Sequence, residues 1–235
     1  MHPPVAGADG CRAGWVVVLA AGADTSVHVV RRFVDVLHIA ADAVVLGIDM
    51  PIGLLDRAVP GGRDCDRRAR RLLGRRACCV FTPPVRAALR AGDYAHALAL
   101  NRRSSDAALG ISIECFGLFA KLREVDTTLR RRPPLARWVR EVHPELAFRA
   151  MARAPAGLPP KRSPVGRAER LALLARRFPA VREAAARPPR GAAADDVIDA
   201  HAVCWSAARI AGGRGVCLPA RPRHDACGLP MAIWY

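Results

Sequence analysis

Short apolar runs separated by turn residues fill the first fifty positions of the chain, and this pattern predicts β-strands. Glycine-containing turns join the first three runs, so we expect a three-stranded meander. Phe33, Val36 and Leu37 have helical spacing and predict a helix that leads to a fourth run. That run is too short for a helix and rich in β-branched residues, which favours a buried parallel strand paired with the first. The predicted strands are 5–9, 15–20, 27–31 and 44–49, and the predicted helix is 33–42.

Helical patterns dominate from residue 51 to residue 134, where prolines and small polar residues separate four predicted helices. Strand character returns before Pro144, which ends it. Ser163 followed by Pro164 is typical of a helix N-cap and first turn. The later predicted elements are helices at 64–73, 85–91, 93–103, 112–129, 164–177 and 195–210, strands at 138–143, 215–218 and 231–234, and a surface loop at 153–160. This order predicts one α/β domain over 1–235, with a mixed sheet and a helical insertion at about 57–135 between the fourth and fifth strands.

Length and composition are those of a globular protein. The chain has 235 residues, of which 51% are hydrophobic and 25% charged. No apolar run approaches the roughly 18 residues that span a bilayer, and residues 1–10 lack the pattern of a signal peptide. We therefore expect a cytoplasmic protein with no membrane partner. Its eight cysteines are expected to be reduced, with several of them buried, and their spacing does not favour a zinc site.

The chain is strongly basic, with a net charge of +16. All but two of its 37 basic residues are arginine; the exceptions are Lys121 and Lys161. Arginine binds phosphate through two parallel hydrogen bonds, so this composition favours nucleic acid as a partner. A GC-rich coding sequence explains the same bias equally well. Because only 5% of the residues are aromatic, a base-stacking surface for single strands is not expected.

Carboxylates stand at the ends of three predicted strands and at the start of the last helix. Asp9, Asp49 and Glu145 follow strands that we expect to be parallel neighbours, and the carboxyl ends of such strands meet at one edge. Asp196 and Asp199 are three residues apart and share a helix face. Oxygen ligands without a cysteine or histidine cluster favour Mg²⁺ or Mn²⁺. Two such ions about 4 Å apart can support phosphodiester cleavage.

Residues of these motifs also have ordinary structural explanations, which are weakest for Asp49, because it follows an apolar run, and for Asp199, because it lies a turn inside the helix. Asp9 precedes Gly10, as in many turns. Asp195 is a candidate N-cap, and acids in the first turn complement the helix dipole. His143 before proline is equally consistent with a hydrogen-bonded histidine of the core.

The arginine-rich segment 64–76 allows two interpretations. Acids at its start and arginines toward its end suit a solvated helix. The same arginines could instead bind phosphate beside the acidic cluster. The candidates for phosphate binding are Arg70, Arg76, Arg86 and Arg102, with Arg123 and Lys161 as additions.

Several short motifs are arranged in order along nearly the whole chain. They are Gly7-Ala8-Asp9-Gly10-Cys11 with Gly14-Trp15, Gly47-Ile48-Asp49-Met50-Pro51-Ile52-Gly53, Cys65-Asp66 with Ala69-Arg70, Glu141-Val142-His143-Pro144-Glu145, Gly166-Arg167-Ala168-Glu169-Arg170, Asp195-Asp196-Val197-Ile198-Asp199-Ala200 and Gly228-Leu229-Pro230-Met231-Ala232-Ile233-Trp234-Tyr235. This ordered set resembles domain-of-unknown-function family 429, whose members are described as predicted nucleases with an RNase H fold. The resemblance implies an RNase H-like sheet. The chain departs from the family at Cys78-Cys79, where small hydroxyl residues are usual, and at Ser112-Ile113-Glu114, where a Ser-Gln pair is common.

A more distant likeness links the motifs to Holliday-junction resolvases of the RNase H-like superfamily. Those enzymes place one acid on the first strand, one on the fourth and a pair on the final helix. The likeness implies that Asp9, Asp49, Asp196 and Asp199 are metal ligands. Glu141 and His143 have no counterpart there and are possible accessory residues, together with Lys161.

The leading hypothesis is a nuclease that depends on Mg²⁺ or Mn²⁺. Its predicted catalytic residues are Asp9, Asp49, Glu145, Asp196 and Asp199. A phosphoryl-transfer enzyme on a ribonuclease-H/actin-like fold is one alternative, although the chain has no glycine-rich phosphate loop. A non-catalytic protein that binds nucleic acid through its arginines is the other.

Overall fold

β2 (Gly14–Ala21) is apolar on both faces, and this property decides how the sheet is covered. Trp15 and Val17 are buried on one face, and Val16 and Val18 on the other. A strand of this kind needs helices on both sides.

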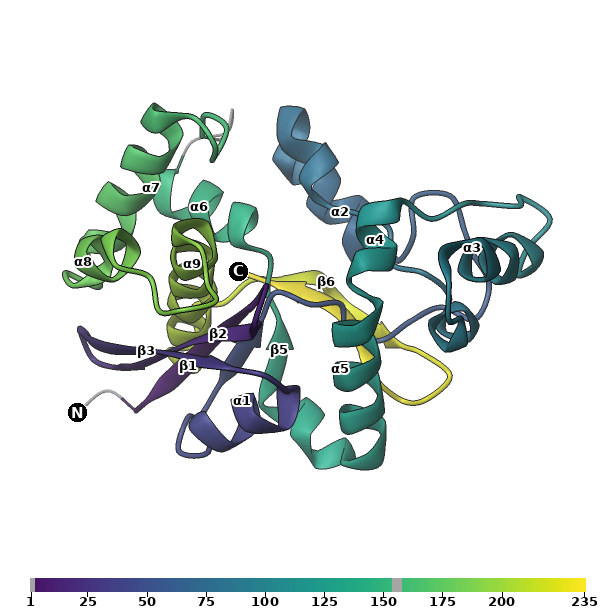
Figure 1. Cartoon of the computed structure of the whole chain (residues 1–235), viewed down its shortest axis with the longest axis horizontal. Coiled ribbons are helices and arrows are strands. Elements are labelled where there is room, and N and C mark those ends of the chain that lie inside the picture. The colour runs from purple at the N-terminus through teal and green to yellow at the C-terminus, as the bar shows by residue number, and fades with distance from the viewer. Residues whose placement is uncertain (1–2, 154–157) are drawn as a thin grey trace.

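The computed structural model describes residues 3–153 and 158–235, and its main sheet has the order β3-β2-β1-β4-β5 (Figure 1). β2 is antiparallel to β1 and to β3, which confirms the predicted meander. β4 is parallel to β1 and β5 is parallel to β4, which confirms that the first, fourth and fifth strands are parallel neighbours. The remaining two strands form a separate antiparallel hairpin. The other strands are β1 (Val5–Cys11), β3 (Asp24–Val30), β4 (Leu46–Ile48), β5 (Val139–Glu141), β6 (Cys217–His224) and β7 (Pro230–Trp234).

Helices lie on both faces of the sheet (Figure 1). α9 crosses one face in contact with β1, β2 and β4, and α6, α7 and α8 pack around it. α1 and α5 cover the other face. Helices α2 to α5 lie between β4 and β5, where the insertion was predicted. The α-helices are α1 (Phe33–Ile39), α2 (Asp64–Leu73), α3 (Tyr94–Arg103), α4 (Ile113–Gly117), α5 (Phe119–Arg131), α6 (Pro144–Ala152), α7 (Pro164–Ala175), α8 (Val181–Ala186) and α9 (Ala194–Ala211), and the 3₁₀ helices are η1 (Gly74–Cys79), η2 (Arg86–Arg90) and η3 (Pro133–Arg137).

The predicted bounds of α2 and the predicted start of α7 are confirmed, whereas several other segments differ from the prediction. Ser163 caps α7 by accepting a hydrogen bond from the Gly166 nitrogen at 3.0 Å, as predicted. The predicted helix 112–129 is divided at Leu118 into α4 and α5, next to Gly117, which weakens a helix interior. The run 85–91 forms a 3₁₀ helix, and helices α6 and α8 were not predicted. β5 ends at Glu141, before Pro144, which occupies the first turn of α6.

The cysteines agree with the expectation from the sequence, and one predicted surface loop is described only in part. All eight cysteines are free, and four of them are buried, whereas Cys78 and Cys227 are exposed. Part of the predicted loop at 153–160, residues 154–157, lies outside the described residues. Among the helices that the structure describes, none has the length and apolarity needed to cross a membrane.

Two glycines let α9 lie directly on the sheet. A Cβ added to Gly7 would be 2.2 Å from the Cys204 nitrogen and 2.6 Å from the Ala200 oxygen, both on α9. A Cβ added to Gly47 would be 2.8 Å from Val203 Cγ1 on the same helix. β1 and β4 therefore touch α9 where they carry no side chain, and any larger residue would separate the layers.

We expect Gly7→Ala to lower the free energy of unfolding by about 3 kcal/mol, because the clashing atoms belong to the α9 backbone and cannot move aside. Urea denaturation followed by circular dichroism measures the change. Gly92→Ala is the matched control, since a Cβ there meets no atom within 4 Å and the expected change is within about 0.5 kcal/mol. Equal stability of the two variants would contradict this account of the contact.

Candidate active site

Two Gly-X-Asp triplets lie in register on the neighbouring strands β1 and β4. Gly7 pairs with Gly47, and the next residues along each strand pair in turn, so Asp9 and Asp49 follow side by side. The Asp49 nitrogen donates a hydrogen bond to the Ala8 oxygen at 2.9 Å, which continues the ladder to this point. Side chains two residues apart share a face of a strand, so both carboxylates face the α9 side of the sheet.

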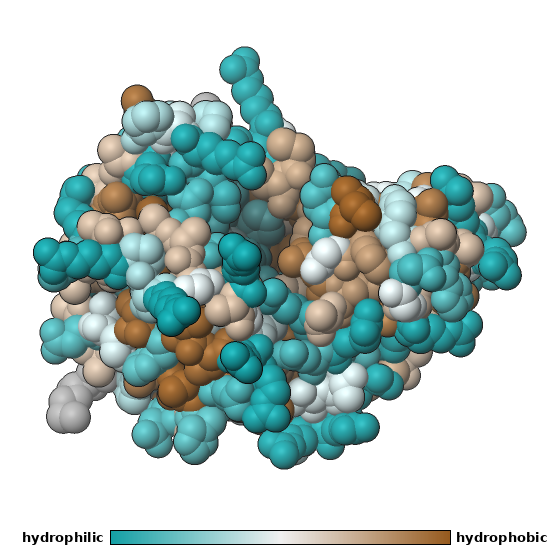
Figure 2. Space-filling model, viewed as in Figure 1, coloured by the Kyte–Doolittle hydropathy of each residue, from teal (hydrophilic) through white to brown (hydrophobic). Residues whose placement is uncertain are grey.

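A third carboxylate comes from α9. Asp199 is buried, and its Oδ2 accepts a hydrogen bond from Lys161 Nζ at 2.6 Å. Asp9, Asp49, Asp199 and Lys161 line one cavity of about 300 Å³. Figure 2 shows this face of the molecule hollowed, with hydrophilic side chains in the hollow between α6 and α2.

The three aspartates repel one another in this cavity. Burial raises the pKa of Asp9 well above its usual value, and the charges of Asp49 and Asp199 raise it further. Burial and the charge of Asp199 raise the pKa of Asp49 to about 8, against the opposing effect of Lys161. Burial also raises the pKa of Asp199, and Lys161 opposes that rise. A positive charge placed among these groups would relieve the repulsion.

The two lysines of the chain lie near this site, Lys161 in the cavity lining and Lys121 against Gly10, the neighbour of Asp9. Lys161 touches Asp199, and despite burial the negative charge of that aspartate raises the lysine pKa. The side chain of Lys121 runs over Gly10, where an added Cβ would be 2.9 Å from its Cδ. Lys121 was not among the predicted site residues. Lysine is rare in this arginine-rich chain, and that rarity could have drawn attention to Lys121.

Glu145 lines the cavity but is bound by arginines. Arg170, which is 1% exposed, donates to both of its carboxylate oxygens at 2.9 Å. Arg76 donates to Oε1 at 3.0 Å. Arg170 is held in turn by the Pro159 and Gly166 oxygens, at 2.8 and 3.0 Å. Arg76 was a predicted phosphate ligand, and here it neutralises a carboxylate instead.

Glu141 belongs to a separate buried ion cluster. It accepts two hydrogen bonds from Arg63, at 2.6 and 2.8 Å, and one from the Ile52 nitrogen at 2.7 Å. Arg63 also pairs with Asp66 at 2.7 Å, and all three charged side chains are buried. The cluster joins β5 to the start of α2, and each of its charged side chains has an ion-pair partner.

His143 caps helix α6 and lines the same cavity as Asp49. Its Nδ1 accepts from the Glu145 nitrogen at 3.3 Å, which places the ring proton on Nε2, where it can donate to the Cys79 oxygen at 3.1 Å. Burial lowers the pKa of His143, so the neutral ring is favoured. It is a hydrogen-bonded histidine at the edge of the site.

The remaining acids of the last helix serve its first turn. α9 begins at Ala194, so Asp195 is not the N-cap, and it pairs with Arg167 at 2.9 Å. Asp196 accepts from the Ala193 nitrogen at 2.8 Å and caps the helix. Asp196 still raises the pKa of Asp9 slightly, although it does not line the cavity.

The other predicted phosphate ligands lie outside the cavity lining. Arg70 donates to the Val80 and Gly61 oxygens and to Thr82 Oγ1. Arg86 pairs with Asp126 and Asp225. Arg102 and Arg123 are exposed, on α3 and α5 respectively.

The donors suit a hard divalent ion in kind, although they are not gathered around one. Within residues 3–153 and 158–235, no three His, Cys, Asp or Glu side chains are close enough to hold a metal as they stand. Lys161 supplies the only direct positive contact to Asp199 in this part of the chain. Three repelling carboxylates with oxygen-only donors nevertheless fit Mg²⁺ or Mn²⁺ better than zinc.

We expect Asp49→Asn to stabilise the metal-free protein at pH 8. A carboxyl whose pKa is raised in the folded state favours folding below its ordinary pKa of about 4, and this contribution is lost as pH rises toward 8. In EDTA at pH 8 the variant should melt about 3–8 °C above the wild type, and near pH 4 the two should coincide.

Thermal melting by circular dichroism measures both differences, with Asp195→Asn as the control because Asp195 is paired with Arg167. Mn²⁺ at pH 8 should raise the melting temperature of the wild type more than that of Asp49→Asn. A variant that melts at or below the wild-type temperature at pH 8 would refute the repulsion among the aspartates.

Comparison with known proteins identifies one family. The model described as "Protein of unknown function (DUF429)" matches residues 7–224, a span that includes Asp9, Asp49, Glu145 and Asp199. No curated protein and no solved structure matches the chain. The resemblance carried by the sequence motifs is confirmed, and the chain belongs to the DUF429 family of proteins of unknown function.

Proposed function

We propose that the protein is a divalent-metal-dependent nuclease that hydrolyses phosphodiester bonds at the cavity of Asp9, Asp49 and Asp199. One observation carries the proposal: three elements, β1, β4 and α9, bring these carboxylates to one cavity where they raise one another's pKa. A structural role would pair each acid with an arginine, as happens at Glu141 and Glu145. Carboxylates left in mutual repulsion are typical of sites that bind a cation.

We further propose that the fold is RNase H-like. The strand order β3-β2-β1-β4-β5 with an antiparallel β2 supports this assignment. So do the positions of the acids, on the first strand, after the fourth strand and on the last long helix. This is the arrangement that the likeness to Holliday-junction resolvases implies.

Asp9, Asp49 and Asp199 would hold Mg²⁺ or Mn²⁺. A bound ion would supply positive charge that polarises a phosphodiester oxygen and lowers the pKa of a water. Asp196 would support the site through its charge while it caps α9.

The lysines and Glu145 have different tasks in this proposal. Lys161 lies in the cavity and carries three donors, so it can bind a phosphate oxygen while it neutralises Asp199. Lys121 lies against Gly10 and outside the cavity lining. Glu145, whose two oxygens are held by Arg170, is a positioning residue that keeps α6 against α7, and we assign no proton transfer to it.

The charge of the chain favours a second candidate function, a protein that binds nucleic acid without cleaving it. The net charge is +16, and phosphate contacts by arginine make binding sensitive to salt. In that case binding would survive replacement of the three aspartates. The same variants therefore discriminate between the two functions.

We expect the wild type to cleave at least one of a panel of single-stranded, duplex, hybrid and branched nucleic acids in Mn²⁺. Asp9→Asn should reduce the rate at least about 100-fold, because removing a direct ligand costs no less than removing an outer partner. Gel electrophoresis of labelled substrates gives the rates, and circular dichroism checks the fold.

Asp195→Asn is the matched control, because Asp195 lies four residues before Asp199 on the same helix but pairs with Arg167. It should retain activity within about twofold. If the folded wild type cleaves none of the substrates but binds them in a salt-sensitive way, the binding function replaces the nuclease.

A further inference from the structure

A second cavity lies at the far end of α9 from Asp199. Its volume is about 440 Å³, and it is formed by the end of α9, the start of β1 and the β2–β3 turn. Trp205, Ala208 and Gly212 follow one another at helical spacing and line one flank of the helix. Asp199 lies on another flank and about 14 Å earlier along the axis, measured to Ala208 at about 1.5 Å per residue. The two cavities are therefore separate.

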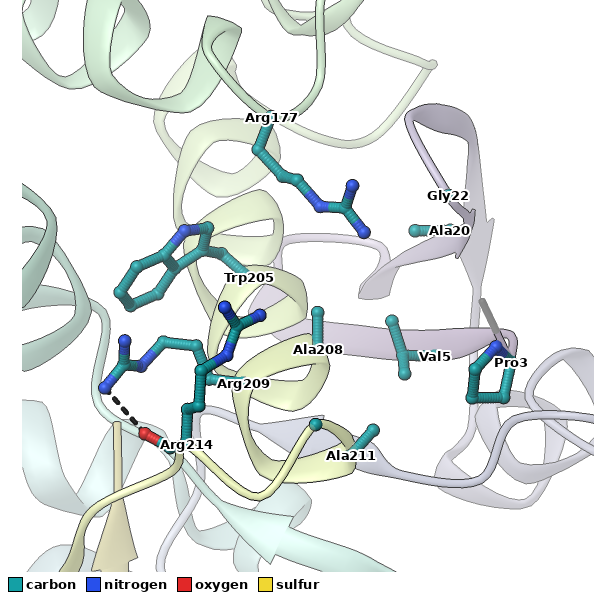
Figure 3. Close-up of a pocket in the computed structure, with 11 residues that line it drawn as sticks. Pro3, Val5, Ala20, Gly22, Arg177, Trp205, Ala208, Arg209, Ala211 and Arg214 are labelled. Atoms are coloured by element: carbon teal, nitrogen blue, oxygen red, sulfur yellow. Dashed lines mark hydrogen bonds between the residues drawn. The ribbon is translucent and has the colours of Figure 1, made fainter. Parts of the chain in front are cut away.

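Three arginines line this cavity, which we call the arginine pocket. Figure 3 shows the guanidinium groups of Arg177 and Arg214 pointing into the space in front of Ala208, with Arg209 beside Trp205. The arginines come from different parts of the chain: Arg177 follows α7, Arg209 is on the last turn of α9, and Arg214 follows that helix. None of the residues that line the pocket is acidic.

Arg209 is fixed in place before any ligand arrives. Its Nη2 donates to the Arg214 oxygen at 2.6 Å, and its guanidinium stacks 4.9 Å from the centre of the Trp205 ring. Its Nε is buried without a hydrogen-bond partner among the described residues. Burial and the positive charge of Arg214 lower the pKa of Arg209, against the opposing effect of Tyr235.

The rest of the pocket is apolar. Pro3, Val5, Ala20, Ala208 and Ala211 provide small hydrophobic surfaces between the arginines (Figure 3). A ligand that fits both parts has an anionic group for the guanidiniums and an uncharged body for the apolar wall. Phosphate is an anion that guanidinium groups bind in a planar, two-point manner.

We propose that the arginine pocket binds the phosphate of a nucleotide unit, held by Arg177, Arg209 and Arg214, with the nucleoside against the apolar wall. The unit can be a free nucleotide or one residue of a nucleic acid strand. This proposal does not depend on the nuclease proposal, because the pocket shares no residue with the aspartate cavity.

Isothermal titration calorimetry in EDTA tests the proposal with three probes: inorganic phosphate, a nucleoside 5′-monophosphate and a short single-stranded oligonucleotide. The double variant Arg177→Gln/Arg214→Gln should lower the affinity for the bound probe at least tenfold. Arg102→Gln/Arg103→Gln removes the same charge from exposed positions on α3 and should change the affinity less than twofold.

The probes separate the sources of the phosphate. Binding of the monophosphate identifies a free nucleotide as a sufficient ligand, whereas binding of the oligonucleotide alone identifies a nucleic acid strand. Ala208→Glu, which places a negative charge in the pocket, should abolish either result and provides a second variant if the arginine changes disturb folding. The proposal is overturned if no probe binds, or if both arginine double variants weaken binding equally.

Discussion

The close contact between α9 and the sheet is the constraint on which the rest of the molecule depends. Gly7 and Gly47 leave the faces of β1 and β4 bare, so the helix backbone and Val203 rest on the strands themselves. The next residue on the same face of each strand is an aspartate, and α9 supplies the third at Asp199. The same contact between α9 and the two strands therefore forms part of the core and brings Asp9, Asp49 and Asp199 close together.

Charge in this protein is used in two different ways. Arg63, Arg86 and Arg170 are buried or nearly so, and each neutralises at least one carboxylate inside the fold. These three arginines belong to the interior, whereas composition alone assigns them to the surface. The aspartates of the cavity differ, because their direct cationic contact is a lysine, Lys161, which binds Asp199. Lysine is a compact charge on a flexible stem and can move between a carboxylate and a phosphate oxygen.

The strands and the position of the acids were predictable because both follow from local pattern. Alternation and run length identified the meander and the parallel strand, and the parallel pairing then placed Asp9 beside Asp49. α6 was missed because Pro144 was interpreted as the end of a strand, whereas β5 ends at Glu141 and Pro144 begins the helix. The arginines were predicted to bind phosphate because a sequence does not show which carboxylate each arginine pairs with. Arg76 and Arg86 have carboxylate partners that are 69 and 139 residues away for their closest contacts.

The sequence by itself determined the family, the order of the strands in the main sheet and the set of acids that reach the strand ends. It did so because periodicity and turn chemistry act over a few residues, which a sequence displays directly. Only the tertiary structure decided which acids stay unpaired. Asp49 and Glu145 both follow parallel strands. Arg170 neutralises Glu145, whereas no arginine in the described residues contacts Asp49. That difference depends on long-range packing of α7 against α6, because ion pairs between distant segments form only when the fold brings them together.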